Sequence, residues 1–178
     1  MTRYVAFLRG INVSGAKIIK MTDLKAMFES AGMKQVKTYI QSGNVRFEST
    51  LADSKKLKRK LEDHLESKLG YHVPILLRTI TELEEAVALD IFKDHLDNPE
   101  VKLYACYLDE KPKALPKLPL VVEKEGLQFI KIINADVYVL SGRVGDHFGF
   151  PNLYIEKNWK VLSTSRNWKT ICKIVGDG

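Results

Sequence analysis

The first eighty residues carry strand and helix patterns in the order βαββαβ, and this order leaves few folds open. At the centre of the pattern, two runs of alternating apolar and polar residues flank Ser42-Gly43. Glycine adopts the positive φ of a tight turn without strain, which favours this pair as the turn of a hairpin. The order is that of the ferredoxin-like, or split βαβ, unit. The sequence therefore predicts an α+β fold with a ferredoxin-like N-terminal half.

The other elements of this half follow from the same periodicities. A strand at 4–8 is apolar on both faces, as expected of a strand covered on both sides. A helix is expected to begin at Thr22 as its N-cap and to close at Gly32. A second helix is expected from about 54 to 70, and a strand from 73 to 79. We therefore expect the first subdomain to span residues 1–80.

The second half, residues 81–178, contains similar elements without a convincing residue-level repeat. Thr81 and Glu84 have the spacing of a capping box and predict a helix through about 89. The remaining predictions are a strand at 101–108, a proline-punctuated loop at 111–119, a hairpin of 127–133 with 137–140, a helix at 153–159, and a last helix opened by Thr164 or Ser165. This half is expected to be a second α+β subdomain packed on the first, in the form of a degenerate split βαβ repeat.

Composition narrows the class of protein. The chain has 178 residues, 45% of them hydrophobic, and a chain of this length buries roughly 70% of its unfolded surface. Its apolar runs are far shorter than the ~20 residues that span a bilayer, and the first residues have no basic leader or cleavage site. We therefore expect a cytoplasmic protein with no membrane association.

The two cysteines, Cys106 and Cys172, have neither CxxC spacing nor a metal-type partner pattern. Both fall in apolar periodic runs, and both are expected to be small core residues. Trp168 is in register with Ile171 and Val175, which favours a core anchor over a stacking platform. The sequence therefore predicts no disulfide framework and no metal site.

The predicted topology gathers polar residues at one edge of the first sheet. In a split βαβ sheet the end of the first strand and the hairpin turn lie at the same edge, because the first crossover is right-handed. Arg9 and Asn12 follow the first strand, and Gln41, Ser42 and Asn44 form the turn. We therefore expect these five residues to lie close together.

A late stretch supplies further polar residues. Thr164, Arg166 and Asn167 come at the expected start of the last helix. Unpaired N–H groups and the dipole at such an end favour an anion, and arginine adds a bidentate donor suited to phosphate. Together with the sheet edge, these residues predict a site for a small anionic, phosphate-bearing ligand. The alternative is that the same groups only cap one another.

Three stretches resemble the bacterial domain-of-unknown-function 1697 family. They are Tyr4-Val-Ala-Phe-Leu-Arg-Gly-Ile-Asn-Val, Thr38-Tyr-Ile-Gln-Ser-Gly-Asn-Val and Thr164-Ser-Arg-Asn-Trp-Lys-Thr. The resemblance spans nearly the whole chain and implies an α+β protein with ferredoxin-like parts and no agreed biochemical activity. The chain departs from the family pattern at Ser14, Ser165 and Lys169. The change at Ser14 argues against a loop that must cradle a ligand through two adjacent glycines.

Two other classes of function stay open. The net charge of +6 allows attraction to nucleic acid, and its densest part is a run of basic residues on one predicted helix: Lys55, Lys56, Lys58, Arg59 and Lys60. An enzyme at the polar edge would need a substrate or metal to supply the chemistry, because no P-loop, HExxH or GxSxG motif is present. His147, in a glycine-flanked loop, is a weaker candidate base. The sequence indicates no cofactor and no oligomeric state.

Overall fold

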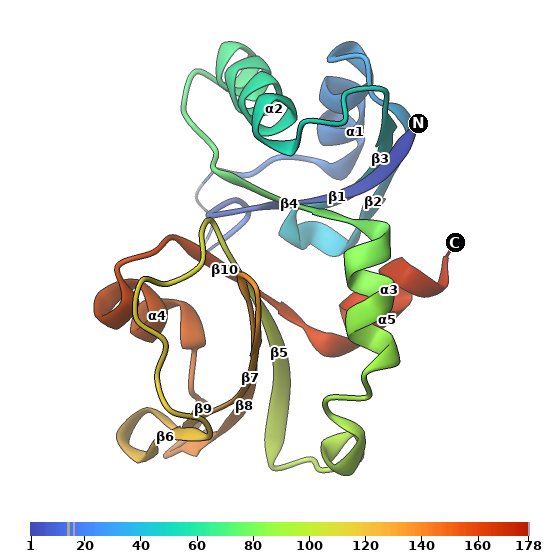
Figure 1. Ribbon diagram of the computed structural model, residues 1–178. Coiled ribbons are helices and arrows are strands. Elements are labelled where there is room, and N and C mark those ends of the chain that lie inside the picture. Colours follow the sequence, from blue (N-terminus) through green and yellow to red (C-terminus); the bar gives the residue numbers. More distant parts are fainter. Residues whose placement is uncertain (14, 16, 178) are drawn as a thin grey trace. The chain divides into compact units, whose positions relative to one another are not determined.

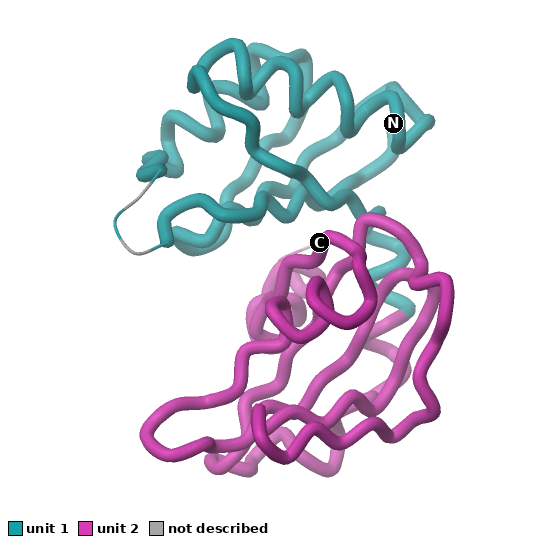
Figure 2. The backbone as a smooth tube through the Cα atoms, turned by 90° about the vertical axis from the view of Figure 1, so that its left-hand side faces the viewer, with its two compact units in different colours: residues 1–85 teal, residues 86–178 magenta. Residues whose placement is uncertain are grey.

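The computed structural model describes residues 1–13, 15 and 17–177. The chain divides into two compact units, Met1–Glu85 and Ala86–Gly178 (Figure 2), where the sequence placed a boundary after residue 80. The family departure at Ser14 lies outside the described residues. Each unit has its own antiparallel sheet, so the chain is an α+β protein as the sequence predicted.

Unit 1 has a four-stranded sheet in the order β2-β3-β1-β4, and each neighbouring pair is antiparallel (Figure 1). This order is compatible with the ferredoxin-like arrangement. Its elements are β1 (Thr2–Leu8), α1 (Met21–Ser30), β2 (Lys34–Tyr39), a short 3-10 turn (Ile40–Ser42), β3 (Asn44–Ser49), α2 (Ser54–Leu69) and β4 (Ile75–Thr79). The helix α3 (Ile80–Ala88) begins in unit 1 and ends in unit 2.

The core of unit 1 forms where the apolar stripes of α1 and α2 meet one face of this sheet (Figure 1). Leu24 and Phe28 of α1 are fully buried there, and the ring of Phe28 lies 5.4 Å from that of Phe47 on β3. β1 is buried on its other face as well, because Val5 and Phe7 are also fully buried. The prediction of a first strand covered on both sides is therefore confirmed.

Unit 2 repeats this strand order in a degenerate form. The path β10-β5-β8-β7-β6 is antiparallel throughout, and its first four strands take the places of β4, β1, β3 and β2 in unit 1. Between β5 and β7 the chain forms a loop and the short strand β6, whereas unit 1 has the helix α1 at the corresponding point of its chain. Its elements are β5 (Val101–Leu108), β6 (Leu120–Val122), β7 (Leu127–Ile133), β8 (Asp136–Val144), β9 (His147–Phe148), α4 (Pro151–Trp159), β10 (Ser163–Asn167) and α5 (Trp168–Gly176), with short 3-10 turns at Lys93–His95 and Glu123–Glu125.

Three predicted helix starts are wrong. α1 begins at Met21 with Lys20 as N-cap, so Thr22 lies inside the helix. The capping pair of α3 is Thr79 with Glu82, two residues before the predicted pair, since Glu82 Oε2 accepts from the Thr79 N–H at 2.7 Å. Thr164 and Ser165 do not open the last helix, because both lie in β10. Asn167 is the N-cap of α5.

No helix in the described part of the chain is long and apolar enough to cross a membrane. Within the same residues, no three His, Cys, Asp or Glu side chains are grouped as metal ligands would be.

Candidate functional site

The end of β1 and the β2–β3 connection meet at one edge of the unit 1 sheet, as the topology predicted. The Leu8 N–H donates to the Gly43 carbonyl at 2.8 Å. The Asn12 amide donates to the carbonyl of Gln41 at 3.0 Å, although 29 residues separate the two. The first two family stretches are therefore neighbours within unit 1.

Asn12 holds this edge together. Its Nδ2 also donates to the Ile19 carbonyl at 3.1 Å, and its Oδ1 accepts from the Ile19 N–H at 2.7 Å. Its backbone has a φ of +53°, a conformation that asparagine tolerates better than most residues. One side chain thus closes the loop after β1 on itself and ties that loop to the hairpin connection.

Asn44 closes the hairpin connection from the inside. It is fully buried, and its Nδ2 donates to the Tyr39 carbonyl at 3.0 Å and to Ser42 Oγ at 2.8 Å. Ser42 is half-buried and Gln41 is exposed. Arg9 is half-buried at the same edge, and its N–H donates to the Pro74 carbonyl at 2.9 Å. The amides of Asn12 and Asn44 therefore brace the backbone of this edge.

The connection between β2 and β3 has a strained backbone. Ile40 has a φ of +48°, which is rare for a β-branched residue, and its side chain is 56% exposed. Beside it, the Tyr39 hydroxyl is buried and has no hydrogen-bond partner among the described residues. Sequence periodicity gave no signal for either feature, because both depend on the backbone conformation of the connection.

We expect Asn12→Asp to lower the free energy of unfolding by about 1–3 kcal/mol, because the two donated hydrogen bonds of Nδ2 are lost and carbonyl oxygens are left facing a carboxylate. Gln41→Ala is the matched control, since Asn12 contacts only the backbone carbonyl of Gln41, and its effect should stay within ~0.5 kcal/mol. Urea unfolding of both variants measures this. Equal effects of the two substitutions would show that Asn12 does not brace the edge.

The third family stretch belongs to unit 2 and spans most of the edge strand β10 and the start of α5. Arg166 is only 7% exposed there, and its guanidinium donates to Thr164 Oγ1 at 2.7 Å and to the Ser165 carbonyl at 2.9 Å. Burial lowers the pKa of Arg166 to about 10, so the side chain stays positive at neutral pH. Arg166 lies in β10, so the prediction that it belongs to the last helix is wrong, whereas its role as an anion ligand stays a prediction.

The other face of β10 carries a buried polar cluster that the sequence did not predict. Ser163 and Ser165 both donate to Asn152 Oδ1, at 3.2 and 2.5 Å, and Ser165 Oγ lies 3.1 Å from Cys106 Sγ. Burial raises the pKa of the Cys106 thiol to about 12, so it stays protonated and unreactive at neutral pH. The prediction of Cys106 as a core residue is confirmed, whereas Cys172 is only half-buried.

A pocket of about 450 Å³ opens at the start of α5, entirely within unit 2. Asn167 is exposed there, and its Oδ1 accepts from the Lys169 N–H at 3.0 Å, which caps the helix. Trp168 is buried against Phe92 and Tyr138, so its predicted role as a core anchor is confirmed. The pocket is lined by Leu96, Asp97, Asn98, Pro99, Val101, Lys102, Leu103, Asn167 and Lys169.

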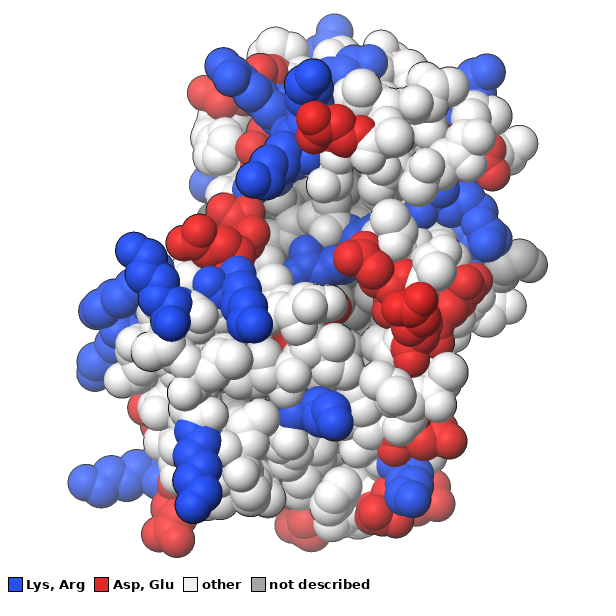
Figure 3. Space-filling model, viewed as in Figure 1, with Lys and Arg blue, Asp and Glu red and all other residues white. Residues whose placement is uncertain are grey.

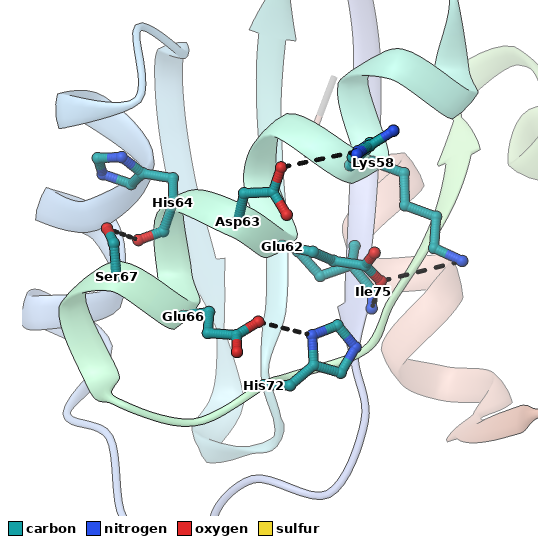
Figure 4. A network of polar contacts seen from close by, with 9 residues as sticks. Lys58, Glu62, Asp63, His64, Glu66, Ser67, His72 and Ile75 are labelled. Atoms are coloured by element: carbon teal, nitrogen blue, oxygen red, sulfur yellow. Dashed lines mark hydrogen bonds and ion pairs between the residues drawn. The ribbon is translucent and has the colours of Figure 1, made fainter.

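The lysine-rich face of α2 is partly neutralised by acidic residues. Lys58 Nζ lies 3.9 Å from Glu62 Oε1, and Arg59 Nε lies 3.9 Å from Asp63 Oδ2 (Figure 4). Lys56 similarly lies 3.9 Å from Asp53, the N-cap of the helix. Because of these ion pairs, the surface of α2 is less positive than its run of lysine and arginine residues indicates.

The candidate base His147 lies in the short strand β9 rather than in a loop, and its side chain is exposed. Its backbone pairs with that of Val144 on β8. Among the residues that the structure describes, no side chain forms a hydrogen bond or ion pair with its ring, so no neighbouring group positions it as a base. The geometry therefore offers no acid–base pair at His147.

Comparisons with known proteins identify one family and a solved structure of similar fold. The family model described as "Protein of unknown function (DUF1697)" matches residues 1–138. Among solved structures, the chain is similar to the conserved bacterial protein SP0830 from Streptococcus pneumoniae, with a TM-score of 0.64 and 24% sequence identity over 99% of this chain and 98% of that one. No curated protein matches the chain. At that identity the likeness to SP0830 shows a shared fold.

Proposed function

This chain belongs to the DUF1697 family of unknown function, and from the geometry of its polar residues we propose that it binds a small phosphate-bearing anion at the start of α5. The observation that carries the proposal is the pocket of about 450 Å³ whose lining combines Asn167 and Lys169 with the N-terminal turn of the helix. Lysine is a compact cation that binds phosphate as a point charge.

Three features of the pocket support an anion. The first N–H groups of a helix have no intrahelical acceptor, and the helix dipole makes that end positive. The amide side chains of Asn98 and Asn167 add hydrogen-bond donors to the lining, and Lys169 adds a formal charge. Asp97 is the one carboxylate among the lining residues, and it would favour ligands that approach from the Lys169 side.

The proposal places the ligand differently from the sequence-based site. Asn167 is common to both. Asn12 and Asn44 are left out, because their amides are engaged in bracing the edge of unit 1. Arg9, Gln41 and Ser42 form an alternative location, which the experiment below separates from the pocket. The basic face of α2 is not favoured, because three of its cations are paired with carboxylates.

Titration calorimetry with inorganic pyrophosphate at low ionic strength tests the proposal. We expect Lys169→Gln to weaken binding at least 5-fold, which corresponds to ~1 kcal/mol. Asn167→Asp should weaken it at least 10-fold without loss of stability, because aspartate is also a good N-cap but repels the anion. Lys173→Gln is the matched control, since Lys173 is an exposed lysine of the same helix that does not line the pocket.

The arms of this experiment separate the two locations. If Arg9→Ala weakens pyrophosphate binding and Lys169→Gln does not, the ligand binds at the unit 1 edge and the pocket assignment is wrong. If Lys169→Gln and Lys173→Gln have equal effects, the attraction is only that of net charge. If the unaltered protein shows no heat of binding at millimolar pyrophosphate, the proposal fails altogether.

A further inference from the structure

The solvent face of α4 has an unusual composition. Phe150, which caps the helix, is 51% exposed, and Leu153 in its first turn is 70% exposed. Lys157 and Lys160 are exposed further along. Positions spaced by three and four residues lie on the same face of a helix. Leu153 and Lys157 therefore share one face of α4, and Phe150 and Lys160 are the N-cap and C-cap at its two ends. These four exposed residues are here called the α4 stripe, with apolar groups at its start and cations at its end.

Phe150 is held in place by the sheet beneath it. The Ser141 hydroxyl donates to the Gly149 carbonyl at 2.6 Å, which fixes the backbone just before Phe150. The ring of Phe150 meets that of Tyr104 on β5 edge-on, with centroids 6.3 Å apart and planes at 87°. This perpendicular contact uses only part of the two ring surfaces. An exposed phenylalanine on a fixed backbone offers a flat surface at little cost in entropy.

The charged side chains that α4 and its two caps expose to solvent are positive. The exposed residues of α4 and its two caps are Phe150, Leu153, Lys157, Asn158 and Lys160, and none of these positions carries a carboxylate. Glu156 faces β10 instead, where its Oε1 accepts from the Ser163 N–H at 3.1 Å. Figure 3 shows Lys and Arg side chains gathered on the flank of unit 2 that holds α4 and the loop at 109–119, with a group of Asp and Glu side chains above them. Because phosphate groups are attracted to such a surface, a polyanion is a fitting partner.

We propose that the α4 stripe binds single-stranded nucleic acid, with a base stacked on Phe150 and the phosphates that follow it contacted by Lys157 and Lys160. At a rise of 1.5 Å per residue the two lysines lie about 10 and 15 Å along the helix from Phe150, so one strand running along α4 meets all three. Stacking on an aromatic ring requires an unpaired base, so the proposal specifies single strands over duplexes.

A membrane surface is the main competing partner for such a stripe, since it also combines apolar and basic residues. The two exposed apolar side chains, Phe150 and Leu153, would bury little area in lipid from a helix of nine residues. A single stacked base, in contrast, would cover the exposed face of the Phe150 ring. None of the four residues of the α4 stripe is among the residues that line the α5 pocket. The inference therefore stands or falls independently of the anion site.

Fluorescence anisotropy with a labelled 12-nucleotide oligo(dT) in low salt tests the inference. Phe150→Ala and Phe150→Leu should each weaken binding by about 5- to 150-fold, because base stacking contributes ~1–3 kcal/mol. Phe150→Leu keeps the apolar contact with Tyr104, so it tests stacking even if Phe150→Ala lowers the stability of the protein. Leu153→Ala, at an even more exposed apolar position beside Phe150, should change binding less than about 2-fold.

Salt dependence tests the phosphate contacts separately. For single strands, each phosphate contact adds ~0.7 to the slope of log K against log salt. The double variant Lys157→Gln, Lys160→Gln should therefore lower that slope by about 1.4, while Phe150→Leu should leave the slope unchanged.

Several results would overturn the inference. Equal losses from Phe150→Leu and Leu153→Ala would show a general apolar contact rather than stacking. Tighter binding of a 12-base-pair duplex than of oligo(dT) would exclude a stacked base. Binding to anionic phosphatidylserine vesicles that depends on Leu153, with no binding of oligo(dT), would assign the stripe to a membrane surface instead.

Discussion

Gly43→Ala is expected to lower the free energy of unfolding by about 2–5 kcal/mol. Gly43 has a φ of +72°, and an L-residue in this conformation costs ~1–2 kcal/mol. A Cβ at this position would also lie 2.7 Å from Ile11 Cδ1 and 2.9 Å from Leu8 Cβ, both in side chains that are buried. Such overpacking adds a further ~1–3 kcal/mol. Urea unfolding followed by circular dichroism measures the sum.

Gly10→Ala is the matched control for this prediction. Gly10 has the same φ of +72°, but no atom lies within 4 Å of the position of its Cβ. Its substitution should therefore cost only the conformational ~1–2 kcal/mol. The difference between the two variants measures how tightly the loop after β1 packs on the hairpin connection. Equal losses would mean that the connection relaxes away from Leu8 and Ile11, and that this edge is not a rigid unit.

The order of elements in unit 1 was predictable because the apolar residues of each element recur at a clear helix or strand spacing. α2 is the clearest case: its leucines recur at helical spacing, and it begins at Ser54 and ends before Gly70 as expected. β5 and β7 have the predicted bounds of 101–108 and 127–133, since alternating apolar residues mark both. These are segments in which local pattern and tertiary burial agree.

The strand β10 was missed because its sequence, Ser-Thr-Ser-Arg-Asn, has no apolar alternation. Its burial depends on partners distant in the chain, such as the pairing of Ser165 with Cys106 and of Arg166 with Ala105. Polar residues before a helical stripe normally indicate an N-cap. Here the cap is Asn167, and the residues before it belong to the sheet, so the predicted anion site included side chains that the strand buries.

The solvent face of α4 was also out of reach of the sequence. Phe150 follows Phe148 and Gly149, and aromatic residues in such a run are usually core residues. Only the turn from β9 into α4 shows that Phe150 is exposed beside Tyr104. The polar edge of unit 1 was predicted from topology, but whether its amides brace the backbone or face a ligand depends on distances that sequence does not contain.

Arg166→Ala is expected to destabilise unit 2 by about 3 kcal/mol or more. The substitution removes charge-assisted hydrogen bonds to Thr164 Oγ1 and to the Ser165 carbonyl, each worth ~1.5–3 kcal/mol. It also leaves a cavity where a long side chain was buried. Part of this loss is offset, because the buried guanidinium is itself costly, as its lowered pKa of about 10 shows. Arg166→Met fills the same space without charge, so it should lose less stability than Arg166→Ala.

Arg143→Ala is the control for removing an arginine from the same unit. Arg143 is exposed and lies 3.8 Å from Glu100, a surface pair worth at most ~1 kcal/mol. Urea unfolding and pyrophosphate binding should be measured on all three variants. If Arg166→Ala unfolds at the same urea concentration as Arg143→Ala but no longer binds pyrophosphate, Arg166 is a ligand-binding residue, as the sequence first predicted. If it loses stability while Arg166→Met keeps both fold and binding, the arginine of the third family stretch serves the structure of β10, and the anion is held by Asn167 and Lys169 without it.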